Sequence, residues 1–219
     1  MAGLKHNWPL LVLVAVLSSR AFCRDKEISF ECGAIEHGKT EVHRRTYPIK
    51  NEFAKKVIVK ITATNNGDGN SPSCDVTWSV AIANGAGSAV LVIDKSEEPD
   101  EDTLGNEVPV LSPDGTKLMV SFWGAAGDYT GYRVAVYDFA TKGGSFRTIA
   151  DRVTRGLPSC DYFTFIEGVT NNGEVVIHVP KSIYVDEGCP DQGKWLLDMK
   201  TNKLTRLPYK HEAPKAQSR

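Results

Sequence analysis

Short runs in which apolar and polar residues alternate dominate the chain after residue 22. Such runs predict strands that bury one face. Turn-forming clusters separate them, among them Asn84-Gly85, Asp114-Gly115 and Asn172-Gly173, whose residues tolerate the positive φ of tight hairpins. No later segment carries a 3.6-residue apolar stripe across ten residues, so helix should be minor, with one short turn near 51–55. We predict antiparallel strands over 56–62, 76–82, 89–93, 108–111, 117–123, 132–138, 146–149, 162–166, 174–179, 195–198 and 204–207.

The N-terminus follows a different pattern. A basic start containing Lys5 precedes an apolar run over residues 10–17, and small residues follow at Ser19 and Ala21. These are the parts of a secretory signal peptide. The run is too short for a membrane anchor, which needs roughly 20 apolar residues, and Phe22 is too large to precede a lipid-modified cysteine at Cys23. We therefore predict a signal peptide over 1–21, a single all-β domain over 22–210 and a disordered tail over 211–219.

Composition and charge narrow the class of protein. With 41% apolar, 24% charged and 9% aromatic residues, the chain is ordinary for a globular domain and unlike a disordered or fibrous one. Lys and Arg number 26 against 27 acidic residues, and removing Lys5 and Arg20 with the signal leaves 24 against 27, a balance of −3. No excess of positive charge favours nucleic acid. No second apolar stretch approaches membrane length, so we expect a secreted or periplasmic protein without a membrane span after signal removal.

Five cysteines are present, and cleavage after Cys23 rather than Ala21 would leave four in an oxidising compartment, where disulfides persist. A hairpin centred on Asn172-Gly173 brings Cys160 and Cys189 near the same register, which favours that pair and leaves Cys32 for Cys74. A bond between Cys74 and Cys160 is the alternative. Zinc is disfavoured because no CxxC pair is present. The predicted disulfide residues are Cys32, Cys74, Cys160 and Cys189.

Two stretches repeat. The segment 72–75, Pro-Ser-Cys-Asp, recurs at 158–161, and the turn within 111–118 aligns with that within 169–175. Each is followed by a second hairpin, over 136–141 and 197–201. Ser-Pro-Asp-Gly-Thr-Lys-Leu at 112–118, followed by Val-Ala-Val-Tyr-Asp at 134–138, resembles the WD40-like repeat of TolB-type β-propellers, well over 108–150 and loosely over 160–208. The resemblance implies an all-β fold of antiparallel, propeller-like blades forming an incomplete or small propeller. A β-sandwich is the alternative.

The catalytic motifs that spacing can reveal are absent: there is no G-x-S-x-G elbow, Walker loop or S-x-x-K. His37 and His43 with neighbouring glutamates, and the acidic run 97–102, are interpreted as solvated surface, and Asn65–Asn70 lacks the last ligand of a calcium loop. We predict no cofactor and no metal site. His178 is expected to be an ordinary strand histidine.

Aromatic residues suggest where a partner binds. The Gly-rich stretch 123–132 is the candidate for an exposed recognition loop, with Trp123, Asp128, Tyr129 and Tyr132 as its binding residues. The sequence thus favours an exported, non-enzymatic domain that binds a protein or other envelope partner through loops at one end of its blades. The alternatives are a secreted hydrolase, or an accessory domain of one, using Asp128, His178 or Asp186, and a structural envelope component.

Overall fold

The computed structural model describes residues 27–67, 73–85, 87–99, 101–126, 129–149, 165–180 and 190–208. These residues form three antiparallel sheets, confirming the all-β prediction. Their one helical element is a 3-10 turn, η2(Cys32–Ala34). Within these ranges no helix is long and apolar enough to cross a membrane. The predicted signal peptide and tail lie outside the described residues.

The first sheet contains four strands in chain order: β2(Thr40–Pro48), β3(Lys56–Asn65), β4(Cys74–Ala83) and β5(Val90–Glu97). In β3 the residues Val57, Val59 and Ile61 are fully buried and alternate with the partly exposed Ile58 and Lys60. Because successive side chains point to opposite faces, this alternation gives the sheet one buried face and one face of partly exposed residues.

The central sheet is built around β8(Lys117–Ala126), β9(Tyr129–Asp138) and β10(Gly143–Ile149). Two short strands, β6(Thr103–Asn106) and β7(Val110–Leu111), pair with successive parts of β8, and β1(Ser29–Glu31) pairs with β6. The third sheet contains β11(Phe165–Val169), β12(Val175–Val179), β13(Gly193–Leu197) and β14(Leu204–Arg206), again in chain order.

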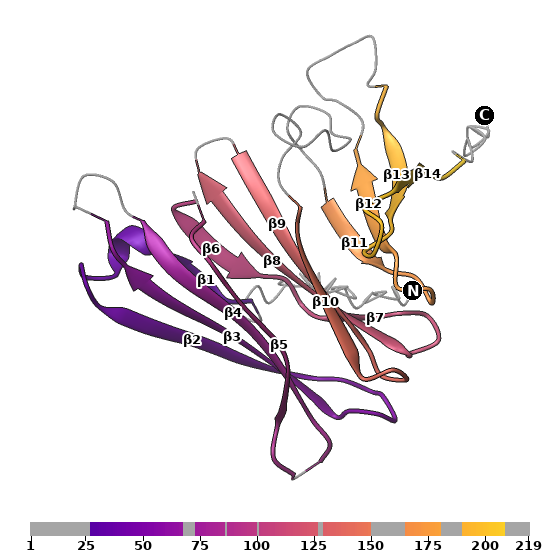
Figure 1. Ribbon diagram of the computed structural model, residues 1–219, viewed down its shortest axis with the longest axis horizontal. Helices are drawn as coiled ribbons and strands as arrows, with labels where there is room; N and C mark the ends of the chain where they lie inside the picture. Colours follow the sequence, from indigo (N-terminus) through magenta and orange to yellow (C-terminus); the bar gives the residue numbers. More distant parts are fainter. Residues whose placement is uncertain are drawn as a thin grey trace, which may run out of the picture.

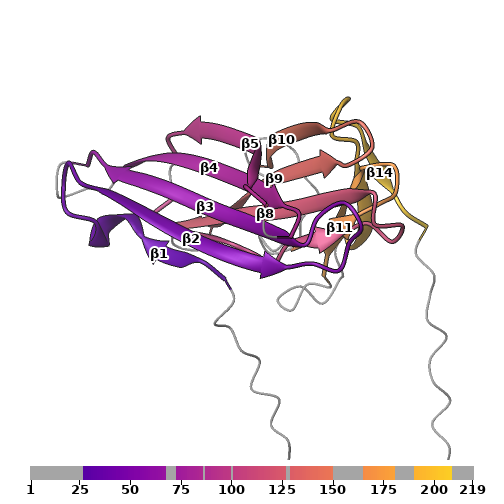
Figure 2. The ribbon, with the colours of Figure 1, turned by 90° about the horizontal axis from the view of Figure 1, so that it is seen from below.

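The three sheets are stacked face to face in chain order, as Figure 1 shows from indigo to yellow. Figure 2 shows β5 and β10 running next to each other where the first two sheets meet, with the backbone oxygen of Val92 against Gly144. One apolar core lies between the first and central sheets, and a second between the central and third sheets. Being buried on both faces explains why β8 begins with the unbroken apolar run 118–120.

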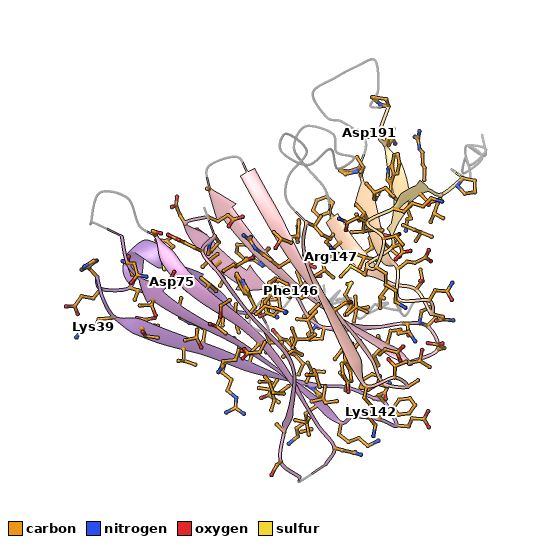
Figure 3. All side chains as sticks on the ribbon, in the orientation of Figure 1. Lys39, Asp75, Lys142, Phe146, Arg147 and Asp191 are labelled. Atoms are coloured by element: carbon orange, nitrogen blue, oxygen red, sulfur yellow. A yellow bond between two sulfur atoms is a disulfide. The ribbon has the colours of Figure 1, made fainter. Side chains whose placement is uncertain are left out.

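Consecutive residues of β10 illustrate the two faces. Phe146 packs against the first core, whereas Arg147 donates hydrogen bonds to the backbone oxygens of Met199 and Lys200 at 2.9 and 3.2 Å. Figure 3 labels both side chains, with Arg147 on the side of the third sheet. The central sheet therefore holds the molecule together from both sides.

The repeated turns have matching hydrogen bonds. Before β8, the hydroxyl of Ser112 accepts the amide of Lys117 at 2.9 Å; before β12, the hydroxyl of Thr170 accepts the amide of Glu174 at 3.2 Å. Both turns contain a glycine with positive φ, Gly115 at 73° and Gly173 at 84°. The second pair of turns also matches: two backbone amides donate to Asp138 in one and to Asp198 in the other. The central and third sheets thus repeat one hairpin pattern.

The disulfide prediction is confirmed for one pair. Cys32 and Cys74 are bonded, with their Cα atoms 6.1 Å apart, which excludes the alternative bond between Cys74 and Cys160. Because Cys32 directly follows β1 while Cys74 begins β4, the bond joins the central sheet to the first. Cys160 and Cys189 lie outside the described residues.

The structure corrects several details. All the predicted strands within the described residues are present, but β1, β2 and β6 were not predicted. Residues 51–55 form bends rather than a helical turn. The 72–75 segment leads into β4, the third strand of its sheet, and its repeat at 158–161 lies outside the described residues. The described strands do not close into a ring, and the propeller remains a prediction.

Candidate functional site

The predicted recognition loop is a hairpin of two long strands. Trp123 lies in β8, Tyr129 and Tyr132 lie in β9, and the strands pair as far as Ala126 and Tyr129. This corrects the prediction of a Gly-rich loop, since only residues 127–128 separate the strands. Asp128 and the side chain of Tyr129 lie outside the described part. The binding role of these four residues remains a prediction.

Trp123 and Tyr132 are directly opposite each other on neighbouring strands, and both are partly exposed. Tyr132 packs against the second core, so the pair faces the third sheet. The indole of Trp123 lies against the backbone of Gly105: a Cβ at position 105 would come within 2.6 Å of two of its ring atoms. Any residue but glycine at 105 would therefore displace this ring.

The next row across the same face holds two polar residues, Glu107 and Ser121. The amide of Glu107 donates to the backbone oxygen of Ser121 at 2.9 Å. Ser121 and Trp123 lie two residues apart on β8, so their side chains point to the same face of the sheet. Glu107 is the cross-strand neighbour of Ser121, and its side chain therefore lies on that face too. Four residues, Glu107, Ser121, Trp123 and Tyr132, thus form a continuous set, which we term the Trp123 face.

The polar groups of this face are poorly solvated. Burial, with a further contribution from the charge of Glu27, raises the pKa of Glu107 to about 7. Burial and the charge of Glu107 raise the pKa of Tyr132 to about 12. The hydroxyl of Ser121, a residue only 2% exposed, has no hydrogen-bond partner among the described residues. Buried polar groups in proteins are nearly always hydrogen-bonded, so this hydroxyl requires an explanation.

A second candidate is the cavity of about 450 Å³ between the central and third sheets, near the repeated turns. Its carboxylates already serve the fold. Slight burial tends to raise the pKa of Asp138, but the hydrogen bond from Lys117 and the backbone amides of the turn lower it. The amide of Lys200 and the hydrogen bonds of Thr201 lower the pKa of Asp198. Lys117 lies 3.1 Å from Asp138. The charged groups that line the cavity therefore stabilise the surrounding turns.

Part of the side-chain arrangement that a hydrolase would need is present. His178 lies on β12 with its Nδ1 2.8 Å from Glu167, and Lys194 binds the other oxygen of that carboxylate. The three side chains are partly exposed, 31–53%, on the outer face of the third sheet. No serine, threonine or cysteine hydroxyl or thiol is hydrogen-bonded to His178 in the described part of the chain. Asp128 and Asp186, the other residues of that hypothesis, lie outside it.

The acidic run 97–102 is not simply a solvated loop. Glu101, 4% exposed, makes a two-pronged ion pair with Arg133, at 2.8 Å for each hydrogen bond, and Glu97 binds the third nitrogen of the same guanidinium. The indole of Trp78 also donates to Glu97, at 3.0 Å. This cluster, the Arg133 cluster, lies between the first and central sheets. The resulting hydrogen bonds and ion pairs raise the pKa of Arg133 despite its burial.

Neither Glu107 nor Ser121 was predicted as a site residue. A usable signal existed in Ser121, a polar residue within the otherwise apolar run 118–123. Glu107 offered none, because its environment depends on which strand pairs with β8.

Histidine, cysteine and acidic side chains in the described ranges form no group of three or more suited to a metal ion.

Comparison with known proteins gives no match to a family model, to a curated protein or to a solved structure.

Proposed function

We propose that this protein is an exported, propeller-like module that binds a partner through the Trp123 face. Export is supported by the predicted signal peptide and by the Cys32–Cys74 disulfide, a bond that persists in oxidising compartments. The propeller-like architecture is supported by the resemblance of residues 108–150 to TolB-type repeats. It is further supported by three successive units of four antiparallel strands, β2–β5, β7–β10 and β11–β14.

The observation that carries the binding function is the buried hydroxyl of Ser121, which has no partner within the described residues although it is close to the partly exposed ring of Trp123. A buried hydroxyl left unpaired costs about 1–3 kcal/mol. A ligand that reached this hydroxyl while covering Trp123 would recover that cost. Aromatic side chains with a few convergent polar groups are the usual lining of a binding site.

Binding is favoured over catalysis by what surrounds these groups. Glu107 is the titratable group closest to neutrality on this face, but no nucleophile activated by a base accompanies it among the described residues. The arrangement therefore supports recognition of a partner rather than its chemical conversion.

The proposal is tested on the chain without residues 1–21, screened against immobilised oligosaccharides, peptides and phospholipid vesicles. We expect binding to members of one class and its loss in Trp123→Ala. Phe165→Ser is the matched control, because Phe165 is an exposed aromatic, 46% accessible, on the outer face of the third sheet. Binding that survives Trp123→Ala but is lost in Phe165→Ser would overturn the proposal, as would binding to none of the three classes.

A further inference from the structure

We infer that the ligand of the Trp123 face is a neutral carbohydrate whose ring stacks on Trp123 while its hydroxyls bind Ser121 and Glu107. The inference rests on the proposed binding function and specifies its ligand. It follows from three properties of the face: a fixed aromatic surface, polar groups that can both donate and accept, and the absence of an unengaged cation on this side of β8–β10 within the described residues.

The aromatic surface is held in place from below. One side of the indole of Trp123 lies against the backbone of Gly105, and the residue is partly exposed. Tyr132 extends the surface on the neighbouring strand, with its own ring anchored in the second core. Sugar rings present flat C–H faces, and such faces pack well on a rigid aromatic side chain because little conformational entropy is lost on either side.

The neighbouring polar groups match sugar hydroxyls. The hydroxyl of Ser121 can donate one hydrogen bond and accept others, and no described residue uses either capacity. Glu107 exchanges its proton close to neutral pH, so its carboxyl group accepts hydrogen bonds when ionised and can also donate when protonated. A sugar hydroxyl, itself both donor and acceptor, can satisfy both residues in either state.

Anionic ligands fit this face poorly. Its described cations on β8–β10 are Lys117 and Arg147, and both are engaged elsewhere. Lys117 pairs with Asp138 at 3.1 Å, and Arg147 donates to the backbone oxygens of Met199 and Lys200. A phosphate or a nucleic acid would therefore meet Glu107 without a compensating positive charge, which is unfavourable in a partly buried site.

Addition of a peptide strand is also disfavoured. β8 is hydrogen-bonded to β6 and β7 on one side and to β9 on the other, and β9 is paired on its second side with β10. Both strands therefore lack the free edge on which an extended peptide could pair. The ligand must instead lie across side chains, as a stacked sugar ring does.

The test is calorimetric titration of the chain without residues 1–21 with four neutral oligosaccharides: chitotetraose, cellotetraose, maltotetraose and mannotetraose. We expect at least one to bind and Trp123→Ala to weaken that binding by about tenfold or more. Trp123→Phe, which keeps a smaller aromatic ring, should retain part of the affinity and guards against a folding defect. Ser121→Ala should weaken binding by about fivefold, since it removes the unpaired hydroxyl.

Phe165→Ser is again the control and should leave the affinity unchanged. Failure of all four sugars to bind at up to about 10 mM, or sugar binding that is indifferent to Trp123→Ala, would overturn the carbohydrate inference. The proposed function would survive that failure if a peptide or a vesicle bound in a Trp123-dependent manner in the screen above. It would fall with the inference if no class of ligand depended on Trp123.

Discussion

Both faces of the central sheet contain buried polar residues, but the two faces differ in whether these residues have hydrogen-bond partners. Toward the first sheet, Arg133 directs all its nitrogens at the carboxylates of Glu97 and Glu101. Toward the third sheet, Ser121 has no hydrogen-bond partner among the described residues, and Glu107 lies close enough to Glu27 for the two charges to repel. One face has its polar groups satisfied by the protein itself, whereas on the other the Ser121 hydroxyl has no partner among the described residues and burial raises the pKa of Glu107.

This difference separates structural from functional burial. A charged group inside a protein is tolerated when hydrogen bonds and opposite charge replace water, as they do in the Arg133 cluster. Groups that remain unsatisfied lower stability. The Arg133 cluster therefore belongs to the fold, whereas recognition of a ligand is the role that we propose for the Trp123 face.

The largest effect is expected from Arg133→Met, which leaves Glu97 and Glu101 without their positive partner. Removing one member of a buried ion pair costs about 3–5 kcal/mol. Because two carboxylates lose their partner here, the expected loss of unfolding free energy is about 5 kcal/mol. The measurement is the free energy of unfolding in denaturant. Arg147→Met is the control, because Arg147 binds only backbone oxygens and should lose about 1 kcal/mol. Equal losses in the two variants would contradict the special role of the cluster.

A second variant compares the ionic link between the first two sheets with the covalent one. Replacing both cysteines, Cys32→Ser with Cys74→Ser, opens a loop closed over a sequence separation of 42 residues. The chain-entropy relation gives a loss of about 4 kcal/mol. Thermal unfolding of this variant is compared with that of the oxidised wild-type protein, in which the bond is intact. A loss below about 1 kcal/mol would show that packing between the sheets makes the bond redundant.

On the Trp123 face the expected effect depends on pH. The pKa of Glu107 is raised in the folded protein from 4.5 to about 7, so between these values the folded state holds more protons than the unfolded state. The contribution of Glu107 to stability is therefore greatest at low pH and is lost as pH rises to about 7. Glu107→Gln removes this dependence and should be more stable than wild type by about 3 kcal/mol at pH 8. Unfolding free energies at pH 5 and pH 8 measure the difference. Parallel pH profiles for the two proteins would contradict it.

The smallest effect is expected for Ser121→Ala. Removing a buried hydroxyl that has no partner relieves its desolvation cost, so this variant should be more stable than wild type by about 1 kcal/mol. Ser79→Ala is the matched control: Ser79 is similarly buried, 3% exposed, but its hydroxyl donates to Asp94 at 2.8 Å, so its loss should cost about 1 kcal/mol. The reverse order would mean that Ser121 is satisfied within the protein after all.

The strands that the sequence predicts are those with a buried face. In β3 and β12, buried residues alternate with partly exposed ones because one side of each strand packs against the core. The sequence does not predict β2, because β2 is an edge strand. Seven of its nine residues are exposed, and apolar and polar residues do not alternate along its charged sequence. Charged side chains on an edge discourage pairing with other chains, so β2 and its neighbours obey different requirements.

Two residues of the candidate site are predicted from the sequence. Trp123 and Tyr132 are expected to bind because they are aromatic and close to glycines; the structure places them opposite each other, and their role in binding stays a prediction. The prediction of a loop is wrong because glycines are not confined to turns: Gly124 and Gly131 pair with each other within the strands. Glu107 and Ser121 join them only because β6 and the segment after it lie alongside β8.

What the sequence determined by itself was local: alternating strands and the turns between them. It favoured the pairing of Cys32 with Cys74 over that of Cys74 with Cys160, and the tertiary structure decided between them. Tertiary structure alone decided which polar residues meet. Glu101 and Arg133 are 32 residues apart, and nothing near either of them in the chain indicates the other. The physical reason is that periodicity and turn geometry act between close neighbours in the chain, whereas burial and charge compensation depend on which sheets are stacked together.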